Sequence, residues 1–98
     1  MRARLLYLAK VVFPDGAIQE AVIWKLPSSS AERPHGLKYS LYYGRADGTS
    51  LIRYDNERGK GDHRHVGGTE QPYRFVDVDT LLADFLADIR REGRRSDG

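Results

Sequence analysis

The chain has 98 residues, which is enough for one domain with a modest hydrophobic core. It contains no cysteine, and this excludes a disulfide framework and any zinc site built on thiolates. Lysine and arginine total 16 against 14 for aspartate and glutamate, so the net charge indicates no particular partner. No apolar run approaches the roughly 20 residues of a membrane-spanning helix, and we expect a cytoplasmic protein without a membrane partner.

Two strands joined by a tight turn are predicted at the start of the chain. Residues 4–13 are rich in Leu, Val, Tyr and Phe, and Pro14-Asp15-Gly16 combines a fixed φ with residues that tolerate a turn. Residues 17–26 return as the second strand. Its more apolar face, which we expect to be the core side, carries Ile18, Val22, Trp24 and Leu26.

A second pair of strands follows a loop. Residues 27–36 hold two prolines and three serines without apolar periodicity, and we expect His35 to be exposed there. From Leu37 to Tyr43 apolar and polar residues alternate, a pattern typical of a half-buried strand. A turn over 44–48 then leads into a fourth strand over 49–55.

The C-terminal part of the chain predicts one amphipathic helix. Residues 73–76 are either a short last strand or an extended lead-in to it. Asp77 and Asp79 are candidate N-caps, and the helix is predicted to end near residue 92. Its apolar residues recur at helical spacing: Val78, Leu81, Leu82, Phe85, Leu86 and Ile89.

These elements predict an α+β fold, an antiparallel meander of four to five strands packed against one C-terminal helix. We expect a single domain over 1–93 and a basic, frayed tail over 94–98.

The segment from Arg53 to Gly68 carries the unusual chemistry of the chain. It holds two of the three histidines, four basic residues, three acidic residues and four of the ten glycines. If residues 63–66 are extended, His63 and His65 point to the same face of a strand. The glycines permit positive φ and let a ligand approach the main chain, where consecutive N–H groups bind anions.

This composition contains the groups that RNA cleavage without a metal needs. They are a base for the 2′-hydroxyl, an acid for the leaving oxygen and cations for the phosphorane charge, and histidine suits both proton roles near neutral pH. We expect Asp55 or Asp62 to orient a histidine, and Tyr54 or Tyr73 to stack on a base or supply a proton. The predicted catalytic residues are His63, His65, Lys60, Asp55 and Tyr54, and the predicted phosphate-binding residues are Arg53, Arg58, Arg64, Gly59 and Gly61.

Two other interpretations of this segment stay open. Glycine with mixed charge is also the ordinary composition of an exposed hairpin loop, where Asp55 and Asn56 can begin a turn through local hydrogen bonds. His-x-His on one strand is also a familiar pair of metal ligands, with Asp55, Asp62 or His35 as a third. Because the nearby cations disfavour a bound dication, we expect no metal and no cofactor.

Several stretches of the sequence resemble the TumE family of bacterial toxin–antitoxin systems. The similarity is most specific from Tyr54 to His65, the stretch Tyr-Asp-Asn-Glu-Arg-Gly-Lys-Gly-Asp-His-Arg-His. It extends to nearly every predicted element, through Tyr73-Arg74-Phe75, Leu82-Ala83-Asp84-Phe85, Pro14-Asp15-Gly16 and Val22-Ile23-Trp24.

This resemblance implies a small cytoplasmic toxin encoded beside a cognate antitoxin, usually a DNA-binding helix-turn-helix protein that neutralises the toxin by direct binding. By analogy with other compact α+β toxins, RNA is the expected target. The first hypothesis is therefore the toxin of a type II system, an RNA-cleaving growth inhibitor. The alternative is a non-enzymatic module that binds protein or nucleic acid through the Gly-rich 53–68 hairpin. A homodimer is compatible with both, because short sheets leave edges that seek partners.

Overall fold

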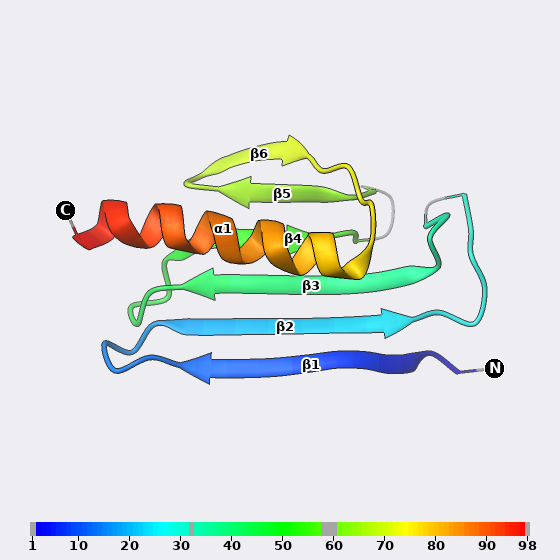
Figure 1. Ribbon diagram of the computed structural model, residues 1–98, viewed down its shortest axis with the longest axis horizontal. Helices are drawn as coiled ribbons and strands as arrows, with labels where there is room; N and C mark the ends of the chain where they lie inside the picture. Colours follow the sequence, from blue (N-terminus) through cyan, green and yellow to red (C-terminus); the bar gives the residue numbers. More distant parts are fainter. Residues whose placement is uncertain (1, 32, 58–60, 98) are drawn as a thin grey trace.

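One antiparallel sheet and one helix make up the part of the chain that the computed structural model describes, residues 2–31, 33–57 and 61–97, with the backbone alone for 93–97. The strands pair in chain order from β1 to β6, and α1 (Val78–Asp97) follows them (Figure 1). The strand bounds are β1 Arg4–Val12, β2 Ile18–Lys25, β3 Leu37–Gly44, β4 Ser50–Asp55, β5 His63–Val66 and β6 Thr69–Pro72. The predicted α+β meander with a C-terminal helix is confirmed, and the described sheet has six strands instead of four or five because β5 and β6 form a further hairpin.

Tight turns join β1 to β2 and β5 to β6. Between β1 and β2, the Asp15 carboxylate accepts a hydrogen bond from the Ala17 N–H at 2.9 Å. Between β5 and β6, Gly67 and Gly68 have φ values of 57° and 87°. Positive φ at both central residues gives a hairpin turn whose twist matches that of the strands, and glycine adopts it without steric cost. The segment 73–77 that follows β6 is the extended lead-in to α1.

The hydrophobic core lies between α1 and one face of the sheet (Figure 1). Tyr39 and Leu41 on β3 and Ile52 on β4 are almost fully buried, together with Leu81 and Phe85 of the helix. Burying one such apolar side chain stabilises the fold by about 1.5–3 kcal/mol. The alternation predicted for β3 and the helical spacing predicted for α1 are therefore confirmed.

The core face of β2 is the opposite of the one that we predicted. Ala21 and Ile23 are buried at 5% and 0% exposure, whereas Trp24 is 37% exposed. In the register of β2 and β3, Ala21 lies beside Leu41 and Ile23 beside Tyr39, so both belong to the face that α1 covers. The prediction compared the two faces of one strand, but the neighbouring strand and the helix decide which face is buried.

α1 begins where predicted and ends later. The Asp77 carboxylate accepts a hydrogen bond from the Thr80 N–H at 2.7 Å, so Asp77 is the N-cap. The predicted end near residue 92 was wrong, because the helix includes Gly93 and runs to Asp97. A single glycine costs a helix about 1 kcal/mol, which does not by itself end it.

A buried polar contact joins α1 to the sheet. Asp88 is 2% exposed, and its carboxylate accepts hydrogen bonds from the Tyr54 hydroxyl and from Arg64 Nη1, the latter at 3.2 Å. Arg64 Nη1 also donates to the Tyr54 hydroxyl oxygen at 3.0 Å. These donors stabilise the charge on Asp88, because a buried carboxylate without partners costs several kcal/mol.

Asp88→Ala removes the acceptor that Tyr54 and Arg64 share beneath the helix. We expect the free energy of unfolding, measured by urea denaturation, to fall by about 3 kcal/mol. The matched control is Asp79→Ala at an exposed position of the same helix, which should cost about 1 kcal/mol or less. Equal losses in the two variants would contradict the anchoring role of Asp88.

The cap at Asp77 gives the protein a specific pH dependence. Its hydrogen bonds with the backbone and side chain of Thr80 lower the pKa of Asp77 below the ordinary 3.8. A carboxyl group with a lowered pKa contributes stability above its ordinary pKa, and this contribution is lost as the pH falls through the folded-state pKa. Asp77→Asn keeps an acceptor without the charge, so its melting temperature should lie below that of the wild type at neutral pH and match it in strong acid. A difference that stays constant with pH would refute this role of the charge.

Candidate functional site

The face of the sheet that α1 leaves uncovered, here called the open face, carries the ionisable residues of the sequence motif. Strand alternation puts Arg53 and Asp55 of β4 on this face, opposite to the buried Tyr54. The register of β4 and β5 pairs Asp55 with His63 and Arg53 with His65. These four side chains are therefore neighbours.

Two hydrogen-bond acceptors contact the ring of His63. Its Nε2 lies 2.8 Å from Asp55 Oδ1, and its Nδ1 lies 3.0 Å from the carbonyl oxygen of Gly61. The His63 side chain is 7% exposed. Each ring nitrogen of His63 therefore faces an oxygen acceptor, and the two contacts fix the orientation of the ring.

Arg53 completes the contacts of the Asp55 carboxylate. Arg53 Nε lies 3.1 Å from Asp55 Oδ2, so each carboxylate oxygen faces a different basic side chain. The Arg53 side chain is 56% exposed. An exposed guanidinium has donors left over after one contact, and these suit a phosphate oxygen.

His65 is the accessible member of the histidine pair. Its ring centroid is 5.7 Å from that of His63, and its side chain is 36% exposed. Its Nε2 lies 3.8 Å from Glu70 Oε1 on β6. The expectation that both histidines share one face is confirmed. Sequence reasoning missed Glu70, although the Gly67-Gly68 turn pairs it directly with His65.

Other residues of the predicted site lie on the core side of the sheet. Tyr54 and Arg64 both contact Asp88 of α1 and are not brought together with the histidines. Burial, together with the hydrogen bond to Asp88, raises the pKa of Tyr54 well above its ordinary 10.0, so the hydroxyl keeps its proton. The predicted site residues Arg58, Gly59 and Lys60 lie outside the described residues.

A second histidine cluster lies next to the start of β3. We expected His35 to be exposed, and this was wrong: its ring centroid is 4.2 Å from that of Phe75, and its side chain is 13% exposed. His35 Nδ1 accepts a hydrogen bond from the Leu37 N–H at 3.1 Å, so Nε2 carries the hydrogen that faces Asp62 Oδ1 at 3.0 Å. Asp62 also accepts from the Tyr39 hydroxyl at 2.7 Å. Asp62 therefore orients this loop histidine and not the pair on β5.

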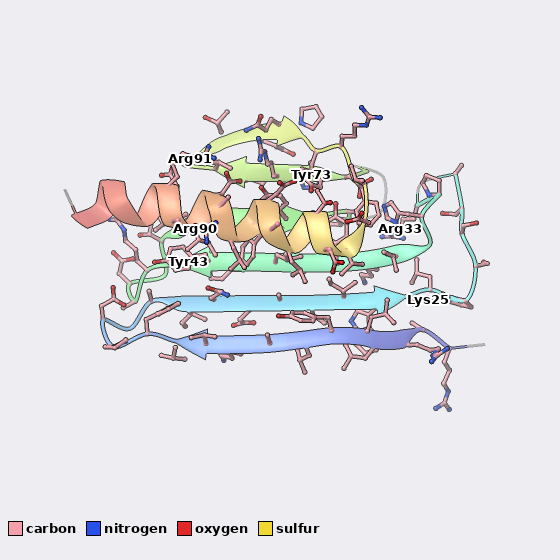
Figure 2. All side chains as sticks on the ribbon, viewed as in Figure 1. Lys25, Arg33, Tyr43, Tyr73, Arg90 and Arg91 are labelled. Atoms are coloured by element: carbon pink, nitrogen blue, oxygen red, sulfur yellow. The ribbon has the colours of Figure 1, made fainter. Side chains whose placement is uncertain are left out.

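Two more residues of the motif region have structural roles. Asn56 is 1% exposed, accepts a hydrogen bond from the Tyr39 N–H at 3.1 Å and donates to the Leu37 carbonyl at 2.7 Å. Tyr73, labelled in Figure 2, donates to Asp84 of α1 at 2.6 Å. Asn56 thus closes the β3–β4 ladder, and Tyr73 joins the lead-in segment to the helix.

Two shallow hollows adjoin one another on the open face. One, of about 180 Å³, is lined by Asp55, Arg53 and Lys38 among others, and the second, of about 240 Å³, lies over β1 to β3. Ser40 lines both. Sites that enclose a small molecule usually have about 300–1,000 Å³, so these hollows suit an extended ligand that lies across the sheet.

The fold and the site together define a small α+β protein that carries a cluster of histidine, carboxylate and arginine side chains on an exposed face of its sheet. The sequence model of one toxin family, described as Toxin TumE, matches residues 2–93. The match covers nearly the whole chain, so the protein belongs to the TumE toxin family, and the resemblance seen in the sequence is confirmed. Membership supports a toxin role and suggests an antitoxin as partner.

No curated protein and no solved structure matches the chain. Among the described residues, α1 is the one helix, and it is not apolar enough over a sufficient length to cross a membrane.

Proposed function

We propose that the protein is the toxin of a type II toxin–antitoxin system and that it inhibits growth in the cytoplasm by cleaving RNA without a metal ion. The observation that carries this proposal is the contact of Asp55 with His63 beside the accessible His65, on a sheet face that no described element covers. Family membership supports the toxin role, and the chemistry of the cluster supports cleavage of a phosphodiester.

In the proposed reaction, His65 is the general base. Its side chain is exposed to solvent, so its Nε2 is within reach of a ribose that lies on the open face. It takes the proton of the 2′-hydroxyl, and the 2′-oxygen attacks the adjacent phosphorus. A general base of this kind contributes about 10²–10⁴-fold to the rate.

His63 is the proposed proton donor to the leaving 5′-oxygen, through the Nε2 hydrogen that faces Asp55 in the free protein. Asp55 and the Gly61 carbonyl orient its ring, and Arg53 beside them stabilises the charge that develops on the phosphorane. The products are a 2′,3′-cyclic phosphate and a free 5′-hydroxyl. Further cations of the proposed phosphate site, Arg58 and Lys60 with Gly59, come from outside the described residues, and Tyr54 and Arg64 take no part.

The proposed antitoxin, a helix-turn-helix protein, contacts the edge strand β1. Several apolar side chains are exposed there, among them Leu8 at 68% and Val12 at 62%. An edge strand of this kind readily accepts a strand or an apolar surface from a partner. A second copy that pairs at the same edge would form the homodimer that the sequence leaves open.

Incubation of the purified protein with total RNA, with and without a chelator, tests the proposed reaction. We expect cleavage that survives the chelator and leaves 2′,3′-cyclic phosphate ends. His65→Ala should lower the rate by about 10²–10⁴-fold, and Asp79→Ala on the exposed side of α1 should keep the wild-type rate. His65 is the better target because loss of the buried His63 also removes one of the two basic partners of Asp55.

Two results would overturn parts of this proposal. Cleavage that the chelator abolishes would exclude the metal-independent mechanism. Intact RNA would exclude cleavage and favour a binding module that uses the 53–68 hairpin.

A further inference from the structure

Three potential metal-binding atoms converge on the open face above β5 and β6. They are His63 Nε2, His65 Nε2 and Glu70 Oε1, which all lie within 4.8 Å of one another. Glu70 Oε1 is 3.9 Å from the His63 nitrogen and 3.8 Å from the His65 nitrogen. We propose that these three residues bind a zinc ion.

The spacing of these atoms fits zinc after small side-chain rotations. Zinc bonds of about 2.0–2.1 Å in tetrahedral geometry put the ligand atoms roughly 3.3 Å apart. The two Glu70 distances are slightly longer than this ideal value. The set has two imidazole nitrogens and one carboxylate oxygen, which are all established zinc ligands.

The surroundings of His63 already orient it as a ligand. His63 donates its Nδ1 hydrogen to the Gly61 carbonyl at 3.0 Å, the arrangement that fixes the ring of most metal-binding histidines and leaves Nε2 for the ion. Arg53 holds Asp55 through Oδ2, so Oδ1 remains on the side of the histidines.

The charges of the cluster also favour a dication. Asp55 and Glu70 bring two carboxylates to the histidine pair, and Arg53 offsets one of their charges, so one net negative charge remains to attract the zinc ion. The hydrogen on His63 Nε2 leaves to solvent as the metal replaces it. Arg53 keeps its contact with the other Asp55 oxygen throughout.

Three protein ligands leave one coordination position to a water molecule. The ion also occupies the His65 nitrogen on which the proposed RNA cleavage depends, so zinc inhibits that reaction. Because the ligands come from β5 and β6, zinc also stabilises this hairpin. Zinc binding stands independently of the proposed function, whereas the inhibition rests on it.

Isothermal titration calorimetry of the full chain with zinc chloride tests the site. We expect one ion per chain, and binding weaker by about tenfold or more in Glu70→Gln. The control is Glu20→Gln, because Glu20 is similarly exposed, at 52% against 49%, but pairs with Lys10; its affinity should equal that of the wild type. Cobalt in place of zinc should give the visible absorption of tetrahedral coordination in the wild type and lose it in Glu70→Gln.

A wild type that binds no zinc, or a Glu70→Gln variant that binds as tightly as the wild type, would overturn the zinc site. The RNA assay separates this proposal from the previous one. If zinc binds as expected but the metal-free protein leaves RNA intact, the cleavage proposal fails and the zinc site stands. If RNA is cleaved but zinc does not bind, the reverse holds.

Discussion

The contact of Asp88 with Tyr54 and Arg64 is the constraint on which the arrangement of the molecule depends. A buried carboxylate is tolerated only where donors face it, so this contact fixes how α1 lies on the sheet. Leu81 and Phe85 of the same helix then fill the core above β3 and β4. One helix covers one face of the sheet, and the other face stays available for function.

The open face shows how a small fold keeps its chemistry apart from its core. In β4 and β5 successive residues alternate between the two faces of the sheet. Tyr54 and Arg64 therefore contact the helix, whereas Asp55 and His63 lie on the open face. The same alternation brings Glu70 on β6 to His65. Acid–base chemistry and metal binding would use the same side chains here, and the metal would therefore act as a switch on the chemistry.

Local patterns in the sequence were sufficient to predict most elements of this fold. The alternation in β3, the helical spacing of α1 and the shared face of His63 and His65 all depend on the periodicity of one element. Two of the errors concerned contacts between distant elements. The buried face of β2 depends on α1, and the packing of His35 depends on Phe75, which lies far along the chain. Glu70 was a different case, because Gly67-Gly68 is a recognisable hairpin signal that predicts its position opposite His65.

The central claim is that the open face, and not the helical side, is the surface that meets RNA. Amide spectra of the ¹⁵N-labelled protein, titrated with a short single-stranded RNA whose 2′-hydroxyls are methylated to prevent cleavage, test it directly. We expect the largest shifts at Arg53, His63 and His65 and at the Trp24 indole, all on the open face. Shifts confined to α1 would contradict the claim. So would the absence of shifts at concentrations of the methylated RNA that inhibit the cleavage of total RNA.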